Sequence, residues 1–280
     1  MKKVIAGSSS PTLARNLAQA LNAPLAETTV KRFPDGEVYV RLHESMEEAV
    51  IVQNTYPDHN IIELLFLQDA ARRAGADTVR VVVPYYGYGR QDRVFEEGEA
   101  VSAAKLARLI QQDADSLVTV DPHKDYITEF FGIPAHACSA VQEIASFFAG
   151  RVDMVLAPDR GAMDRAQAAA RVIGCPHDYL EKKRLSGKEV EMHPKELEVE
   201  GGAVLIIDDI ISTGGTMAAA IRSLKAQGAS AVYAACSHGL FAGDAVERIT
   251  AAGCDDIVAT DTVESAYSTI SAAPAVAACL

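Results

Sequence analysis

Residues 203–217 read AVLIIDDIISTGGTM, and this stretch decides the fold. Its first five residues are apolar and mostly β-branched, which is typical of a strand buried on both faces of a parallel sheet. Two aspartates, Asp208 and Asp209, stand where we expect that strand to end. Small hydroxyl residues and two glycines then lead to Met217, where an apolar helix begins. The stretch therefore predicts a strand, a short loop and a helix.

The loop of residues 212–216 predicts a binding site for a phosphate group. Its small residues allow the backbone N–H groups to wrap around an anion, and the N-terminus of the following helix adds a partial positive charge. The adjacent carboxylates of Asp208 and Asp209 are unsuited to phosphate. They can instead accept hydrogen bonds from sugar hydroxyls or hold a divalent cation. The alternative is a buried strand followed by an acidic, glycine-rich turn.

The composition indicates a globular protein of the cytoplasm. A chain of 280 residues is long enough for two domains, and a net charge of −12 argues against nonspecific binding to nucleic acid. No apolar run reaches the roughly 20 residues that a membrane span needs, and the first apolar run is too short for a signal peptide. Five scattered cysteines without a C-x-x-C pair argue against structural zinc and a disulfide framework, and they fit a reducing compartment.

Strand-like and helix-like patterns alternate along the whole chain, and the pattern restarts after residue 146. We therefore predict an α/β fold of two similar domains, residues 1–146 and 147–280, each a parallel sheet flanked by helices. Ser10 is a natural N-cap, and Pro11 suits the first position of a helix. Residues 182–202 are rich in Lys, Glu and Gly, and we expect a mobile loop or a hairpin there.

Two clusters in the N-terminal half suit a nucleotide. In the sequence FPDGE (33–37), Phe33 can stack on a purine, and the two carboxylates can accept hydrogen bonds from an amine or from ribose. An ordinary exposed turn is the alternative. The sequence PYYGYGRQDR (84–93) follows an expected strand, at the sheet edge where α/β proteins bind ligands. Its arginines and tyrosines suit a triphosphate and a base, although a salt-bridged surface loop is also possible.

Two further clusters suggest a cation and a catalytic charge. His123 lies in VDPHKD (120–125) and Asp159 lies in PDRGA (158–162), both after expected strands, so each can bind a divalent cation directly or through water. A structural histidine is the alternative. The sequence EKKR (181–184) places three positive charges at the start of the expected loop, where a solvated face is the alternative. The chain contains no G-x-x-x-x-G-K-[ST] motif, which excludes a P-loop kinase.

Taken together and in this order, the clusters resemble the ribose-phosphate pyrophosphokinases, also called phosphoribosyl pyrophosphate synthases. The matching segments span nearly the full chain: 33–37, 84–93, 120–123, 158–162, 181–184 and 208–216. The resemblance implies transfer of the diphosphoryl group of ATP to ribose 5-phosphate, with Mg²⁺ as cofactor. It also implies two domains of the type I phosphoribosyltransferase kind and a homo-oligomer, a dimer or a multiple of dimers, that shares its ATP site between subunits.

The resemblance also implies roles for individual residues. Lys182 and Arg184 would be catalytic, and His123 and Asp159 would bind the metal. The ATP site would comprise Phe33, Asp35, Gly36, Glu37, Arg90, Gln91 and Asp92. The ribose 5-phosphate site would comprise Arg184, Asp208, Asp209, Ser212, Thr213, Gly214, Gly215 and Thr216.

The chain departs from the bacterial members of this family at two places, and the first of these, Ser212, places it nearer the archaeal branch. Ser212 stands where bacterial members usually carry an acidic residue, and residues 93–101 are acidic where bacterial members are often basic. Two other functions stay open from the sequence. A phosphoribosyltransferase would explain residues 203–217 equally well but would leave the 33–37 and 84–93 clusters unused. A non-catalytic regulatory paralogue would be expected to lose the loop charges, yet Lys182 and Arg184 are both present.

Overall fold

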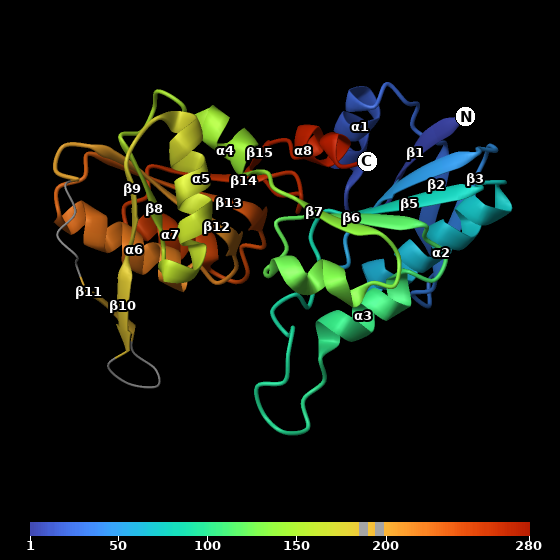
Figure 1. Cartoon of the computed structure of the whole chain (residues 1–280), viewed down its shortest axis with the longest axis horizontal. Coiled ribbons are helices and arrows are strands. Elements are labelled where there is room, and N and C mark those ends of the chain that lie inside the picture. The colour runs from blue at the N-terminus through green and yellow to red at the C-terminus, as the bar shows by residue number, and fades with distance from the viewer. Residues whose placement is uncertain (185–189, 194–198) are drawn as a thin grey trace. The chain divides into compact units, whose positions relative to one another are not determined.

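The computed structural model describes residues 1–184, 190–193 and 199–280 (Figure 1). The chain forms two compact units. The first comprises Met1–Ser139, Asp261–Glu264 and Ser271–Leu280, and the second comprises Ala140–Thr260 and Ser265–Ile270. The boundary expected after residue 146 lies inside helix α4 (Val141–Phe148), because that helix buries its apolar residues in the core of the second unit. Each unit contains a parallel sheet flanked by helices, which confirms the predicted fold class.

The sheet of the first unit has five parallel strands in the order β1-β4-β5-β6-β7. Their bounds are Lys2–Ala6 for β1, Glu48–Val52 for β4, Thr78–Val83 for β5, Ser116–Val120 for β6 and Ala135–Cys138 for β7. The central strands are apolar on both faces, as the sequence pattern requires for a sheet covered on both sides.

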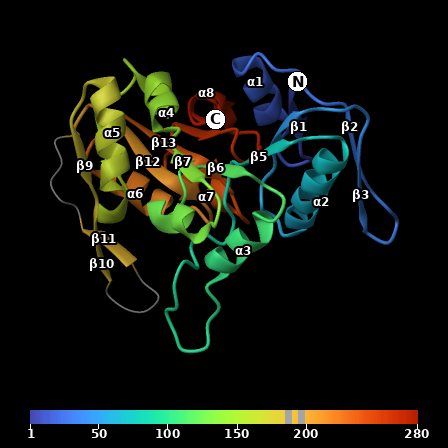
Figure 2. The ribbon, with the colours of Figure 1, turned by 45° about the vertical axis from the view of Figure 1, so that its right-hand side comes forward.

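Helices cover both faces of this sheet (Figures 1 and 2). Helices α1 (Pro11–Ala20) and α8 (Ala273–Ala278) pack together on one face, and α2 (His59–Arg73) and α3 (Ser102–Ile110) lie on the other. The C-terminal segment is held to α1 through the buried carboxylate of Asp261. This carboxylate accepts hydrogen bonds from Asn16 Nδ2 at 3.0 Å, Ser271 Oγ at 2.7 Å and the Ala272 N–H at 2.7 Å.

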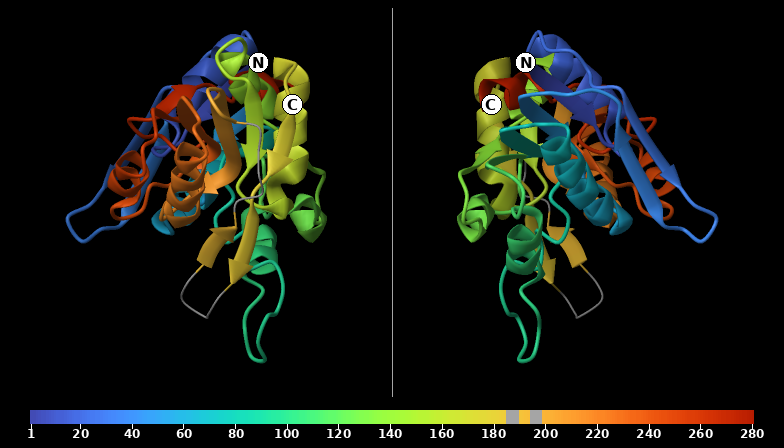
Figure 3. Two further views of the ribbon diagram at one scale, coloured as in Figure 1. Left: turned by 90° about the vertical axis from the view of Figure 1, so that its left-hand side faces the viewer. Right: turned by 90° about the vertical axis from the view of Figure 1, so that its right-hand side faces the viewer.

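The first unit also carries an antiparallel hairpin of β2 (Thr28–Arg32) and β3 (Val38–Leu42). Val30, Val40 and Leu42 of this hairpin pack against the core on the α2 side of the sheet. The hairpin turn projects away from its unit, and so does the loop between β5 and α3 (Figure 3). A 3₁₀ helix, η1 (Asp125–Phe130), follows β6.

The sheet of the second unit has six parallel strands in the order β15-β14-β13-β12-β8-β9. Their bounds are Ser268–Ile270 for β15, Asp256–Thr260 for β14, Ala231–Gly239 for β13, Ala203–Ile211 for β12, Met154–Ala157 for β8 and His177–Tyr179 for β9. Helices α4 and α5 (Met163–Ile173) share one apolar core with this sheet, and α6 (Gly215–Ala226) and α7 (Ala245–Ala251) share the other.

A short antiparallel hairpin of β10 (Glu181–Arg184) and β11 (Val190–His193) follows β9. It lies in the segment for which we expect a mobile loop or a hairpin, and residues 185–189 and 194–198 of that segment lie outside the described residues. Across the described part of the chain, no helix has the length and apolar character that crossing a membrane requires.

Candidate functional site

The two aspartates of the deciding stretch lie at the carboxyl edge of the second sheet. The strand that carries them, β12, is longer than the sequence predicts and continues to Ile211, because β13 pairs with it that far. On its other side β8 pairs with β12 only as far as Ile206. Asp208 and Asp209 therefore lie beyond the end of β8, on a strand that is still held firmly by β13.

The loop after these aspartates leads directly into α6. Gly214 is the N-cap of this helix and has φ of +71°, a conformation that side chains other than hydrogen rarely allow. A Cβ atom at Gly214 would lie 2.8 Å from the Ala245 carbonyl oxygen and 3.1 Å from the Ile249 side chain. Glycine is thus required here by the backbone and by the close approach of α7. The loop lies at the N-terminus of a 12-residue helix, where an anion is favoured.

Asp208 and Asp209 form an electrostatically coupled pair. Burial and the neighbouring Asp209 carboxyl raise the pKa of Asp208 to about 8, while Arg165 partly opposes this rise. Arg165 extends from α5, and its Nη1 lies 4.0 Å from an oxygen of each carboxylate. Its Nε is buried and has no hydrogen-bond partner among the described residues. Asp208 therefore favours its protonated form more than a free aspartate does, and a cationic group stands beside the pair.

Asp159 and the predicted catalytic residues come from neighbouring strand ends. Asp159 follows β8 and is half-buried, and its Oδ1 accepts a hydrogen bond from the Gly161 N–H at 2.9 Å. Lys182 and Arg184 lie in β10, which begins directly after the end of β9, and their backbone partners in β11 are Met192 and Val190. The carboxyl ends of β8, β9 and β12 are adjacent in one parallel sheet, so they bring these segments to a common edge.

The predicted adenine-binding turn closes the β2–β3 hairpin of the first unit. The Phe33 N–H donates to the Glu37 carbonyl at 2.8 Å, and the Glu37 N–H donates to Asp35 Oδ1 at 3.1 Å. Phe33 is 43% exposed and meets Tyr39 edge to face, with their ring centroids 6.0 Å apart. Lys31 Nζ lies 5.6 Å from the Phe33 ring centroid. An exposed ring beside two exposed carboxylates can therefore meet a planar ligand.

The loop of residues 84–93 is anchored to its unit by its tyrosines. Tyr86 is buried and donates from Oη to the Ala103 carbonyl at 2.8 Å, and this burial raises the pKa of Tyr86. Asp92 is also buried and accepts a hydrogen bond from Tyr126 Oη. Arg90 is exposed, and Gln91 is half-buried and donates to Glu99 Oε2 at 3.1 Å. Arg90 is thus an exposed cationic group of this loop, available to a ligand.

His123 follows β6 at the carboxyl edge of the first sheet and is exposed. Its Cβ lies beside Gly89, 3.7 Å from the position that a Cβ of that glycine would occupy. Within the described residues there is no cluster of three or more His, Cys, Asp and Glu side chains that could hold a metal ion. A cation here would need oxygen ligands from water or from a substrate in addition to the protein.

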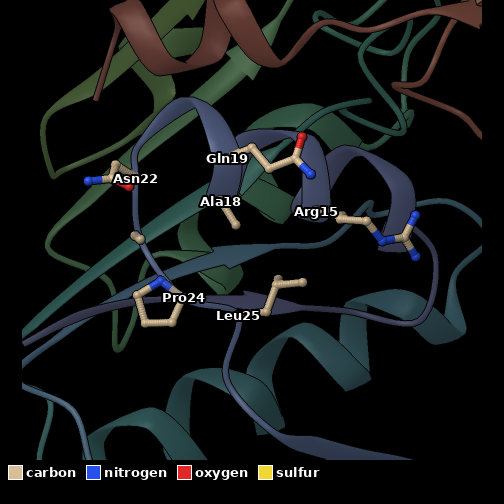
Figure 4. Close-up of a pocket in the computed structure, with 7 residues that line it drawn as sticks. Arg15, Ala18, Gln19, Asn22, Pro24 and Leu25 are labelled. Carbon is tan, nitrogen blue, oxygen red and sulfur yellow. The ribbon is translucent and has the colours of Figure 1, made fainter.

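The first unit also has a surface hollow (Figure 4). It is formed by α1 and the segment that follows it, with Arg15 and Gln19 on the helix and Pro24 and Leu25 opposite. Arg15 is the charged residue of this lining, and no predicted site residue belongs to it. The hollow therefore lacks the carboxylates and the anion loop that characterise the edge of the second sheet.

Two arginines near the deciding stretch were not singled out from the sequence. Arg165 lies six residues after the predicted metal ligand Asp159 and faces the aspartate pair. Arg248 lies in α7 and donates from Nη1 to the Thr213 carbonyl at 3.2 Å. The position of Arg165 near the start of the helix after PDRGA is the one signal in the sequence that could have indicated its role. No comparable signal indicates Arg248.

Comparison with known families covers both halves of the chain. The model described as the N-terminal domain of ribose phosphate pyrophosphokinase matches residues 2–113. The model described as a phosphoribosyl transferase domain matches residues 135–268. Together these matches include most of the residues of both units.

Individual proteins give the same result. The ribose-phosphate pyrophosphokinase of Methanopyrus kandleri is 45% identical over 98% of this chain and 97% of that protein. The one from Methanothermobacter thermautotrophicus is 43% identical over 98% of both chains. A crystal structure of phosphoribosylpyrophosphate synthetase from Mycobacterium smegmatis is 28% identical, with a TM-score of 0.84 over 99% of this chain and 97% of that one. This chain therefore belongs to the ribose-phosphate pyrophosphokinase family.

Proposed function

We propose that the chain transfers the diphosphoryl group of ATP to the O1 hydroxyl of ribose 5-phosphate, giving 5-phosphoribosyl 1-pyrophosphate and AMP. The observation that carries this proposal is the similarity to a ribose-phosphate pyrophosphokinase at 45% identity over 98% of the chain. The match of residues 2–113 to the N-terminal domain of that enzyme favours this reaction over that of a phosphoribosyltransferase.

The edge of the second sheet suits ribose 5-phosphate. Residues 212–216 would bind the 5-phosphate through backbone N–H groups and the positive end of α6. Asp208 and Asp209 would bind the ribose hydroxyls. Sugar hydroxyls can donate hydrogen bonds to carboxylate oxygens, and the raised pKa of Asp208 favours the protonated form, which can also donate to a sugar oxygen.

The first unit suits ATP. Phe33 would stack on adenine, and Asp35, Gly36 and Glu37 would accept or donate hydrogen bonds at the base edge. Arg90 and Gln91 would hold the nucleotide, with Asp92 fixing their loop through Tyr126. In the ribbon the hairpin turn and the loop after β5 are separate projections of one unit (Figure 3). This separation supports a homo-oligomer, a dimer or a multiple of dimers, in which the turn completes the ATP site of a neighbouring subunit.

The chemical step requires positioned charge. We assign in-line attack of the ribose O1 on the β-phosphorus of ATP, a type of transfer that depends mainly on alignment and on neutralising the phosphoryl oxygens. Lys182 and Arg184 would neutralise charge on the transferred group, and Arg184 would also contact ribose 5-phosphate. Their hairpin begins at the sheet edge that carries the aspartate pair.

The protein groups fit Mg²⁺ in the manner typical of phosphate-transfer enzymes. Mg²⁺ keeps several waters and binds through one or two protein groups together with substrate phosphates. The exposed His123 of the first unit and the half-buried Asp159 of the second would each suit such a role. The metal would supply charge neutralisation on the triphosphate. We also propose a cytoplasmic location, which the scattered cysteines of the chain fit.

The reaction is tested by incubating the purified chain with ATP, Mg²⁺ and ribose 5-phosphate and separating the products by ion-exchange chromatography. We expect AMP and phosphoribosyl pyrophosphate in equal amounts, with the diphosphate identified by ³¹P NMR. Ribose without its phosphate serves as the control for the loop of residues 212–216. Release of ADP in place of AMP would contradict diphosphoryl transfer, and no turnover under these conditions would favour a regulatory paralogue.

A further inference from the structure

Three consecutive carbonyl groups, from the last residue of β12 into the loop that follows, are held from one side. The hydrogen bonds come from the segment that follows β13 and from α7. The Ile211 carbonyl accepts from the N–H groups of Leu240 at 3.0 Å and Phe241 at 3.1 Å, the Ser212 carbonyl accepts from the Ala242 N–H at 3.0 Å, and the Thr213 carbonyl accepts from Arg248 Nη1 at 3.2 Å. Three consecutive carbonyls therefore face the β13–α7 segment.

This arrangement fixes where the N–H groups of the loop point. In a trans peptide the N–H lies opposite the C=O of the same plane, and the peptide bonds of this loop are trans. The N–H groups of Ser212, Thr213 and Gly214 are therefore directed away from the β13–α7 segment. Successive N–H groups pointing to one side form a concave site for an anion.

One of these peptides needs an external anchor more than the others. The plane between Thr213 and Gly214 is followed by a glycine in the left-handed region, with φ of +71°. Glycine adopts both signs of φ, so rotating this plane by half a turn meets little steric resistance from the residue itself. Backbone N–H groups hold the two preceding carbonyls, whereas the side chain of Arg248 holds this one.

The guanidinium of Arg248 is itself held in place. Asp244, one helical turn earlier, accepts two hydrogen bonds from Nη2 at 2.7 and 2.9 Å. These hydrogen bonds and the Arg248 charge lower the pKa of Asp244, so its carboxylate stays ionised. The Arg248 side chain is 40% exposed, and exposed ion pairs of this kind add little to stability. Because Nη2 donates to both carboxylate oxygens, the guanidinium plane is fixed, and so is the direction of its remaining N–H groups.

We infer that Arg248 is a positioning residue that keeps the Gly214 N–H directed at the 5-phosphate of the substrate. The inference rests on the proposed function, because it assumes that this loop binds the phosphate of ribose 5-phosphate. Arg248 acts through the backbone and does not need to touch the ligand. Its effect is on phosphate affinity, and the nucleotide in the first unit is unaffected.

The test compares Arg248→Gln, Arg248→Lys and Arg222→Gln. Arg222 is an exposed arginine of α6 in the same unit, so its replacement removes the same charge without releasing the Thr213 carbonyl. Isothermal titration should show ribose 5-phosphate affinity about tenfold lower for Arg248→Gln, since one hydrogen bond to a charged group is lost. Arg248→Lys should recover part of the affinity, and ATP affinity should not change in any variant.

A second readout separates this inference from the proposed function. In protein labelled with ¹⁵N-glycine, inorganic phosphate should shift the Gly214 amide resonance of the unsubstituted chain and shift it less in Arg248→Gln. This result without ribose 5-phosphate binding would contradict the proposed function and keep the anchoring role. Equal ribose 5-phosphate affinity in Arg248→Gln and the unsubstituted chain would overturn the inference. So would equal losses in Arg248→Gln and Arg222→Gln, or a Gly214 resonance that phosphate does not move.

Discussion

Each unit contains a strand, a loop of small residues and a helix, yet the two loops differ in where their polar groups are directed. In the first unit, the loop Gly7–Ser10 between β1 and α1 is closed by its own fold. Ser8 donates from its N–H and its Oγ to the buried Glu63 carboxylate, both at 2.6 Å. Ser9 donates from the same two groups to Gln53 Oε1. In the second unit the loop after β12 is anchored through its carbonyls instead.

This difference teaches that small residues before a helix do not by themselves make an anion site. The Thr12 N–H in the first turn of α1 already binds the Glu264 carboxylate at 2.5 Å, so the fold supplies its own anion there. Neither α1 nor α6 carries an acidic residue in its own first turn, so the carboxylate that α1 binds comes from elsewhere in the chain. What distinguishes the two loops is whether their N–H groups are already used.

The largest effect on activity is expected from substitutions in the two hairpins, one in each unit. Lys182→Ala and Arg184→Ala, in the hairpin of the second unit, should each lower turnover by at least about a hundredfold and leave ATP binding nearly intact, because they act on the transition state. Lys183→Ala is the matched control, since it removes the same charge from the same strand. Phe33→Ala, in the hairpin of the first unit, should instead weaken ATP binding. The measurement is steady-state kinetics with equilibrium ATP binding.

Near-normal turnover in both Lys182→Ala and Arg184→Ala would remove this hairpin from the mechanism. A loss in Lys183→Ala as large as in the other two would mean that the total charge matters and the positions do not. Either result would also weaken the distinction between a nucleotide hairpin and a catalytic hairpin.

The next effect separates the loops themselves. Gly214→Ala should lower ribose 5-phosphate affinity by about tenfold or more, because a Cβ would lie 2.8 Å from the Ala245 carbonyl oxygen in a strained backbone conformation. Gly7→Ala would instead press on the Gln53 side chain, with a Cβ 2.1 Å from Oε1. That change should lower the stability of the first unit and leave ribose 5-phosphate affinity unchanged. Calorimetric titration of ribose 5-phosphate and thermal unfolding of both variants test these expectations. Weaker ribose 5-phosphate binding in Gly7→Ala, with normal binding in Gly214→Ala, would contradict them.

The sequence predicted much of this fold because its signals are local. The apolar, β-branched stretch at 204–207 forms part of β12, and Pro11 begins α1 as expected. The extension of β12 to Ile211 was not predictable, because it depends on pairing with β13. Ser10 makes no side-chain capping hydrogen bond, and Glu264 binds in that turn from a segment 252 residues away.

The return of the C-terminal residues to the first unit was missed for the same reason. It depends on the Asp261 carboxylate, which accepts a hydrogen bond from Asn16, a residue 245 positions away in the sequence. The site shows the same pattern. Motifs within a few residues of one another, such as the aspartate pair and the phosphate loop, were visible in the sequence. Arg165 and Arg248 were not, because only packing of α5 and α7 brings them to the stretch.

A smaller effect concerns the aspartate pair, which the first loop lacks. Asp208 has a raised pKa of about 8 in the folded chain, so its contribution to stability is fully present below the unfolded value and is lost as pH rises through the folded value. Above that pH the folded chain carries the cost of a buried, ionised Asp208 carboxylate. Asp208→Asn removes this charge and should raise the Tm by about 3 °C or more at pH 9, with little change at pH 4. Differential scanning calorimetry across this range checks the sign. A Tm difference that does not vary with pH would contradict the raised pKa.

The smallest effect tests whether Glu264 closes the first loop. Its carboxylate binds the Thr12 N–H at the N-terminus of α1, and a carboxylate at that position contributes modestly to helix stability. Glu264→Ala should therefore lower the Tm by about 1–3 °C. Glu264→Gln keeps a hydrogen-bond acceptor without the charge, so its Tm should lie between those of Glu264→Ala and the unsubstituted chain. Ribose 5-phosphate affinity should be unchanged in both, because Glu63 and Gln53 still occupy the serine donors of that loop. Inorganic phosphate could also raise the Tm of Glu264→Ala more than that of the unsubstituted chain. That result would mean that the first loop binds an anion once Glu264 is removed, so that this single carboxylate keeps the loop closed.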